Sequence, residues 1–308
     1  MDSCFKILPA GSLLLSLALC ACLLITPHAH GRETITWLLR DLAPLTIARG
    51  PDRNRGAVDQ ALPLMRAALP DYDHSVLRVN RARASQMLAE PGLYCDPALL
   101  WTRQRAQTIF YSVPSMHVLG STLVMQRIDL PLIADFMDDG KVDLGALLRS
   151  GTLALGIIAG RSYGSVVDRI LAEADSRQIL AHHGNDAMGS LLRMERLGRI
   201  HALLGYWLEA RYQARQEGLD PQQMVQVPIK GAARTQIVHV GCSDSPTGRR
   251  VVDALNPLLL ELRSGQLAQL YAQWLAPHER SDYLRETRAL FNARRFNAQS
   301  TEALSSQR

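Results

Sequence analysis

Residues 153–164 read LALGIIAGRSYG, and residues 165–172, which follow directly, read SVVDRILA. The run 153–158 is short and apolar, which predicts a buried strand. Gly160 and Gly164 mark a loop. The segment 165–172 then places its apolar residues on one face of a helix. A strand, a glycine-containing loop and an amphipathic helix are the repeating unit of an α/β fold, so this stretch predicts that fold class.

The chain before this unit shows the same alternation. Strands are predicted at 35–39, 74–79 and 93–95, and helices at 57–69 and 81–90. Pro63 lies within the first of these helices, which must therefore begin late, near Asp59, or kink at the proline. The order strand, helix, strand, helix, strand favours parallel pairing in one sheet.

The chain after this unit continues in the same way. Strands are predicted at 179–182, 200–204, 225–229 and 238–242, and helices at 188–197, 206–216 and 267–275. An apolar strand at 118–125 lies between the two runs, so we expect a boundary between two lobes near Gly120. Ser245 and Pro246 are a good N-cap and first residue for a long helix, which Pro257 should kink.

The N-terminal segment is typical of a secretory signal peptide. Lys6 precedes an apolar run at 7–25, and small residues stand at the third and last positions of the segment 27–31. We predict a leader at 1–31 and a periplasmic mature protein. An uncleaved membrane anchor is an alternative, because about 20 apolar residues can span a bilayer. Lipoprotein processing at Cys22 is a further, less favoured alternative.

Removal of the leader leaves two of the five cysteines, Cys95 and Cys242. In an oxidising compartment they could form a disulfide. Two small buried thiols are the alternative.

The charge pattern argues against a nucleic-acid partner. The formal net charge is +5, but the arginines are scattered, no lysine-rich run occurs, and only 6% of the residues are aromatic. With 308 residues, 47% of them hydrophobic, the chain can form one large domain or two medium lobes.

Several segments in chain order carry a family resemblance. They are DLAPL at 41–45, TRQR at 102–105 followed by FYSVP at 110–114, the loop region 156–164, and VHVGC at 238–242. Together they resemble the bacterial extracellular solute-binding protein family 3, the periplasmic amino-acid-binding proteins, in a divergent branch.

The resemblance implies an α/β, two-lobed type II periplasmic-binding-protein fold with two hinge crossovers. Lobe 1 would comprise 32–120 plus 236–285 and lobe 2 would comprise 121–235, leaving a polar tail at 286–308. It also implies a monomer that needs no cofactor. The protein would capture a small polar or anionic solute between its lobes and deliver it to an ABC-transporter permease or a membrane sensor.

The resemblance also implies site residues. Arg105, with Arg103 as a nearby alternative, lies where the family grips a ligand carboxylate, and a guanidinium is a two-pronged donor suited to that group. Arg161, Ser162 and Tyr163 lie in the glycine-containing loop, where free backbone N–H groups and a hydroxyl could donate to an anion.

Asp41 and Pro44 lie in the turn after the first strand and are also assigned to the ligand site. The sequence departs from the family at two places. His201 stands where an acidic residue is expected to hold the ligand ammonium, and residues 98–100 (ALL) replace small hydroxyl side chains. We therefore expect a ligand other than a standard α-amino acid.

Neither a metal site nor a catalytic constellation is predicted. His182 and His183 are adjacent on a strand and point to opposite faces, so they cannot easily share an ion with His201. A dehydratase-like enzyme on the same scaffold remains the alternative function. It would need a pocket acid or base, for which His201 and Glu173 are candidates.

Overall fold

The computed structural model describes residues 31–305, with side chains to residue 293. The predicted leader at 1–31, apart from Gly31, and the lipidation candidate Cys22 lie outside the described residues. No helix in the described part of the chain combines the length and the apolar composition needed to cross a bilayer.

The first lobe is built on a five-stranded mixed sheet with the order β2-β1-β3-β12-β4. Its strands are β1 (Thr34–Leu39), β2 (Asp73–Arg78), β3 (Tyr94–Leu100), β4 (Ile109–Leu119) and β12 (Thr235–Ser243). Strand β1 runs parallel to both β2 and β3, as the alternating pattern predicts, whereas β12 runs antiparallel to β3 and β4.

The second lobe is built on another five-stranded mixed sheet, with the order β11-β5-β10-β8-β9. Its strands are β5 (Ser121–Gln126), β8 (Leu155–Ile158), β9 (Ile179–His182), β10 (Ala202–Tyr206) and β11 (Met224–Val227). Strand β8 lies parallel to β9 and β10, and β5 is antiparallel to β10 and β11. These two sheets confirm the predicted α/β class and the two-lobed fold.

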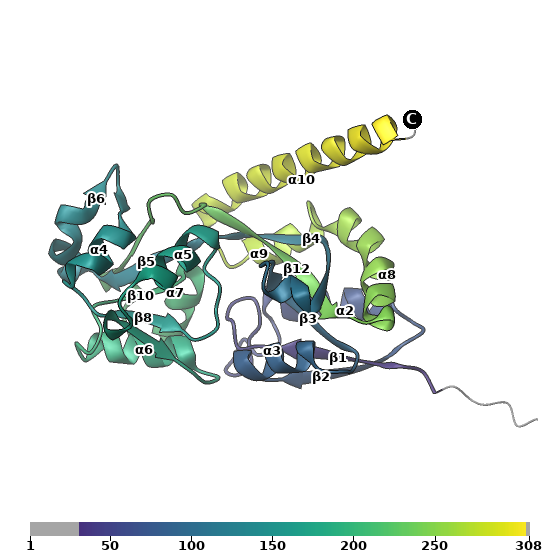
Figure 1. The fold of residues 1–308 in the computed structure, drawn as a ribbon, viewed down its shortest axis with the longest axis horizontal. Helices are drawn as coiled ribbons and strands as arrows, with labels where there is room; N and C mark the ends of the chain where they lie inside the picture. Colours follow the sequence, from purple (N-terminus) through teal and green to yellow (C-terminus); the bar gives the residue numbers. More distant parts are fainter. Residues whose placement is uncertain (1–30, 306–308) are drawn as a thin grey trace, which may run out of the picture. The chain divides into compact units, whose positions relative to one another are not determined.

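Helices cover both sheets (Figure 1). The first lobe carries α2 (Ala57–Ala67), α3 (Arg81–Ala89), α8 (Pro246–Leu262), α9 (Gln266–Ala272) and α10 (Pro277–Ser305). The second carries α4 (Leu144–Ser150), α5 (Ser165–Glu173), α6 (Ala187–Arg196) and α7 (Trp207–Gln216). Short 3₁₀ turns at Arg105–Gln107, Arg127–Phe136, Ser176–Gln178 and Pro221–Gln223 and a small hairpin, β6 (Met137–Asp138) with β7 (Lys141–Val142), complete the fold.

The two sheets are joined by two crossovers that lie against each other. The chain leaves the first sheet at Gly120, between β4 and β5, and returns to it between β11 and β12. The amide of Gly120 donates to the carbonyl of Arg234 at 2.7 Å. A Cβ at residue 120 would lie 2.4 Å from the carbonyl oxygen of Ala233, so only glycine allows this close approach.

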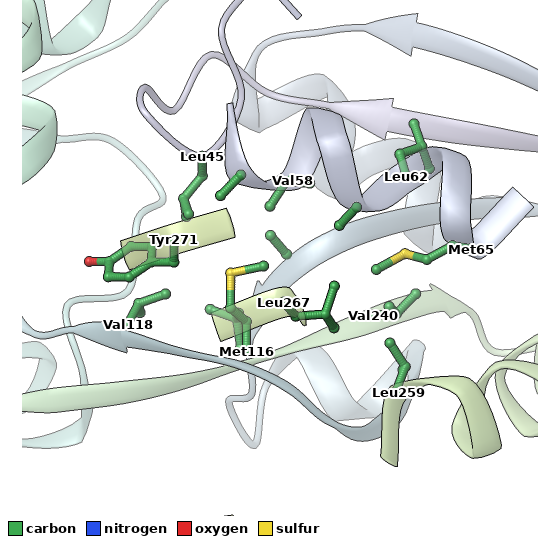
Figure 2. Packing of buried hydrophobic residues seen from close by; sticks show 14 of the residues in the cluster. Leu45, Val58, Leu62, Met65, Met116, Val118, Val240, Leu259, Leu267 and Tyr271 are labelled. Carbon is green, nitrogen blue, oxygen red and sulfur yellow. The ribbon is translucent and has the colours of Figure 1, made fainter. Parts of the chain in front are cut away.

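The core of the first lobe lies between its sheet and helices α2, α8 and α9. Figure 2 shows Val58, Leu62 and Met65 of α2 in this core, with Met65 beside Val240 of β12 and Leu259 of α8 in the same cluster. These side chains are buried because α2 and α8 each present one apolar face.

The same core contains the two cysteines of the first lobe, which form a disulfide. Cys95 on β3 and Cys242 on β12 are directly paired residues of antiparallel neighbours, with their Cα atoms 4.1 Å apart. Both are fully buried. Of the two possibilities that the sequence leaves open, the structure has the disulfide.

The second sheet is covered on both faces, which explains its nearly uninterrupted apolar strands. Ala202 and Leu204 of β10 point toward α4 and α5, and Leu203 between them points toward α6 and α7. The sheet is therefore the middle of three layers.

Some predicted elements differ in the structure. Helix α2 begins at Ala57 and continues through Pro63, which excludes the late start and leaves the kink as the remaining alternative. The strand predicted at 118–125 is two strands, β4 and β5, divided at Gly120. The tail predicted at 286–308 instead continues α10, and its Thr287 and Phe291 are buried.

Helix α10 is fastened to the first lobe through the end of β4. The hydroxyl of Tyr283 donates to the carbonyl of His117 at 2.6 Å, and the imidazole of His117 is 2.9 Å from the Thr287 hydroxyl. Arg234, in the second crossover, forms an ion pair with Glu286. Helix α10 thus contacts the end of β4 and the second crossover.

Candidate functional site

Polar side chains gather where strands of the two sheets end. Arg40 follows β1, Arg81 lies three residues after β2, and Arg161 lies three residues after β8. These three residues and Arg105 line one small cavity between the lobes, which we name the arginine chamber. Open α/β sheets usually bind ligands just beyond the carboxyl ends of their strands, because the loops that follow the strands converge there.

Two of the four arginines have a carboxylate partner. Arg40 donates to both oxygens of Asp96 on β3, and the pair is buried. Arg161 donates to both oxygens of Glu209 on α7, at 2.5 and 2.7 Å, with both side chains about 3% exposed. Burial alone would lower the pKa of Arg161, but the charge and hydrogen bonds of Glu209 outweigh it and raise that pKa.

The other two arginines have no carboxylate partner among the described residues. Arg105 donates to the carbonyl of Leu100 in its own lobe at 3.1 Å, and to that of Gly160 in the second lobe at 3.2 Å. Arg81 has a buried Nε without a hydrogen-bond partner. Burial, together with the positive charge of Arg40, lowers the pKa of both side chains.

A second chamber adjoins the first and has mixed charge. Arg40, Arg81 and Arg161 line it as well, together with Asp41 and Glu209. Each chamber holds about 20 Å³, which is room for about one water molecule. The lobes therefore meet closely around these side chains.

Asp41 lines the space between the lobes, and its role in ligand binding stays a prediction. Burial raises the pKa of its carboxyl to about 6; Arg49 opposes this shift, and the nearby acids Glu209 and Asp186 add to it. Its nearest cation, Arg49, is 3.9 Å away and largely exposed. The negative charge of Asp41 is therefore poorly neutralised by its exposed partner, and acidic side chains of the second lobe lie near it.

The loop 161–164 is arranged differently from the prediction. The Ser162 hydroxyl lines the arginine chamber but donates to Asp168 of α5. The backbone N–H of Tyr163 also bonds to Asp168, and that of Gly164 to the Ser162 hydroxyl. The loop therefore satisfies most of its donors internally, because Asp168 caps it.

The side chain of Tyr163, which was assigned to the ligand site, packs in the core of the second lobe and lines neither chamber. Its ring is 2% exposed in the second-lobe core, and its hydroxyl oxygen accepts from the backbone of Ile158. Pro44 is also buried, after a cis Ala43–Pro44 peptide bond, and lines neither chamber.

His201, which was predicted to be a ligand residue, lines neither chamber. It precedes β10, and its Nδ1 accepts from the backbone of Ala154, which precedes β8. Both chambers lie beyond the opposite ends of these strands. The acids of the second lobe that line the chambers are Glu209 and Asp186. The other acid–base candidate, Glu173, is exposed and lines a different pocket, beside α4.

Sequence reasoning therefore missed Arg40, Arg81, Asp96 and Glu209. A usable signal was present, since Arg40 and Arg81 stand one and two residues after predicted strands. Charged residues that follow parallel strands reach the same sheet edge. No group of three or more His, Cys, Asp or Glu side chains within the described part of the chain is close enough to hold a metal ion.

Comparison with known proteins finds structures but no sequence family. No protein-family profile matches the chain, and no curated protein matches it. A histidine kinase sensor domain with similarity to periplasmic binding proteins is similar over 80% of this chain and 96% of that one, at 15% identity and a TM-score of 0.58. A substrate-binding protein of an ABC uptake transporter from Streptococcus pneumoniae, solved with bound histidine, covers 79% and 92%, at 18% identity and a TM-score of 0.57.

An arginine-specific periplasmic binding protein from Salmonella typhimurium is similar over 79% of this chain and all of that one, at 11% identity and a TM-score of 0.57. Identities this low bear on the fold alone. These structures confirm, for the fold, the resemblance inferred from the sequence. The chain has the type II fold of the periplasmic amino-acid-binding proteins.

Proposed function

We propose that the chain is an exported solute-binding protein that captures a small polar or anionic solute between its two lobes. The observation that carries this proposal is Arg105, a first-lobe residue whose guanidinium lines the inter-lobe chamber and, among the described residues, donates only to carbonyl groups. Carbonyls do not neutralise its charge, and a carboxylate would do so with matched geometry.

Capture would require the lobes to separate and close again. The arginine chamber has about 20 Å³ of free volume, so a solute larger than water needs it to widen. The contact between Arg105 and the carbonyl of Gly160 joins the lobes directly. A solute that replaces this contact with a stronger one would favour the closed state, because only that state offers donors from both lobes.

Transport and sensing are the two outlets that the fold supports, since its structural relatives include both an uptake-transporter binding protein and a kinase sensor domain. In this proposal the mature protein works in the periplasm with a permease or a membrane sensor as its partner. Genes for a permease and an ATPase next to the gene for this chain would favour transport, and a sensor gene would favour sensing.

A thermal-shift screen of organic acids, amino acids and amines, followed by calorimetry, tests the proposal. With a ligand so identified, Arg105→Ala should weaken binding by tens- to thousands-fold, because the loss of one charged partner in a desolvated site costs about 2–5 kcal/mol. The matched control is Arg103→Ala, since Arg103 is exposed and two residues away. Affinity that stays within twofold in Arg105→Ala would show that Arg105 is not the anchor.

A further inference from the structure

The arginine chamber holds more positive charge than its carboxylates compensate. Four guanidinium groups line it, and two carboxylates, Asp96 and Glu209, pair with two of them, which leaves a surplus of two positive charges. The surplus belongs to Arg81 and Arg105.

Arg81 is the less compensated of the two. Within the described residues no ion pair or hydrogen bond engages its guanidinium, and its Nε is shielded from solvent. The other charged side chains that line this chamber, those of Arg40, Arg105 and Arg161, are all cations, and the acids nearest Arg81 line the adjoining second chamber. A partly buried cation in such surroundings costs stability unless a bound anion offsets it.

The two uncompensated side chains converge on one point of the second lobe. The Nη2 of Arg105 donates to the carbonyl oxygen of Gly160. A Cβ built on Gly160 would lie 3.8 Å from the Cδ of Arg81. Gly160 is therefore near both side chains, and a single small molecule bound beside it can reach both guanidinium groups.

We infer that Arg81 and Arg105 together form a subsite for a dianion, either a dicarboxylate or an oxyanion such as phosphate. A monocarboxylate carries one charge and can neutralise one of the two guanidinium groups. A dianion neutralises both, so the chamber should discriminate by charge as well as by shape. This inference rests on the proposed function, since it names the class of solute that the same site selects.

The apo protein provides a test that needs no ligand. Arg81→Gln removes a repelled cation and keeps much of the side-chain length, so it should raise the thermal midpoint of the ligand-free protein. The matched control is Arg83→Gln on the same helix, because Arg83 is exposed and lies 3.7 Å from Glu90 at the surface. That control should leave the midpoint unchanged.

Calorimetry on the same variants then tests the charge preference, with glutarate, succinate, inorganic phosphate and the monoanion butyrate as probes. Wild type should bind at least one dianion at least tenfold more tightly than butyrate. Arg81→Gln should remove that preference by weakening the dianion about thirtyfold or more, with butyrate affected less than threefold. Preference for glutarate or succinate identifies a dicarboxylate site, and preference for phosphate an oxyanion site.

Two results would overturn the inference. One is the absence of a dianion preference in wild type, and the other is an Arg81→Gln variant that keeps the preference. The proposed function fails separately, through Arg105→Ala. A monoanionic or zwitterionic ligand from the wider screen that depends on Arg105 but not on Arg81 would keep the function and reject the dianion subsite.

Discussion

Glu209→Gln should destabilise the protein strongly, because it leaves Arg161 without its counter-charge. The two side chains are about 3% exposed, and both guanidinium nitrogens that bond to Glu209 lose an ionic acceptor. Tyr206, whose ring lies 5.5 Å from the Arg161 guanidinium carbon, offers only a weak substitute. Breaking a buried pair by removing one partner costs about 3–5 kcal/mol.

Urea denaturation followed by circular dichroism measures this cost. The matched control is Glu217→Gln, one residue beyond the same helix, which breaks a surface pair with Arg193 and should cost about 1 kcal/mol or less. The double variant Arg161→Met/Glu209→Leu should recover most of the loss, because it removes both charges. If Glu209→Gln costs no more than Glu217→Gln, the buried pair does not form in solution and the description of the site is wrong.

Three further predictions concern other parts of the molecule. Burial raises the pKa of Glu195 from an ordinary 4.5 to about 7, so between these pH values the folded state holds a proton that the unfolded state has lost, and stability should fall as the pH rises. In urea titrations, Glu195→Gln should therefore raise the free energy of unfolding by about 3 kcal/mol at pH 8 and leave it unchanged at pH 4. Gly120→Ala should lower the free energy of unfolding by about 1–3 kcal/mol, because the added Cβ would clash with the backbone at the crossover. Its control, Gly265→Ala, has open space around the added Cβ and should leave the thermal midpoint nearly unchanged. Replacing Cys95 and Cys242 by alanine should cost about 5 kcal/mol by loop entropy for a separation of 147 residues, and a loss under 1 kcal/mol in guanidinium titrations would contradict that account.

The sequence predicted the fold well because apolar periodicity records burial. Leu203 and its neighbours in β10 form an unbroken apolar run, and that run is what a sheet covered on both faces requires. Helix α10 was missed because its surface is largely polar. Its buried residues Tyr283, Thr287 and Phe291 nevertheless recur every four positions, which is a helical signal with one polar member.

The site was less predictable, for a physical reason. Motif spacing placed Arg105 and Asp41 at the space between the lobes, but it assigned the acid of the second lobe to His201, at the wrong end of β10. Which residues face a cleft depends on strand direction and on where each strand ends. Pairing such as that of Arg161 with Glu209, 48 positions apart, depends on the tertiary fold and leaves no local pattern.

The disulfide between β3 and β12 closes a covalent ring that contains the whole second sheet, since β5 to β11 all lie between residues 95 and 242. Both ends of the second lobe are therefore tethered to neighbouring strands in the core of the first. A protease that cuts once inside the ring leaves a single covalent molecule, and its fragments separate on a gel only after reduction. If the second lobe unfolds by itself, its ends stay in place, and it refolds with most of its loop-closure entropy already removed.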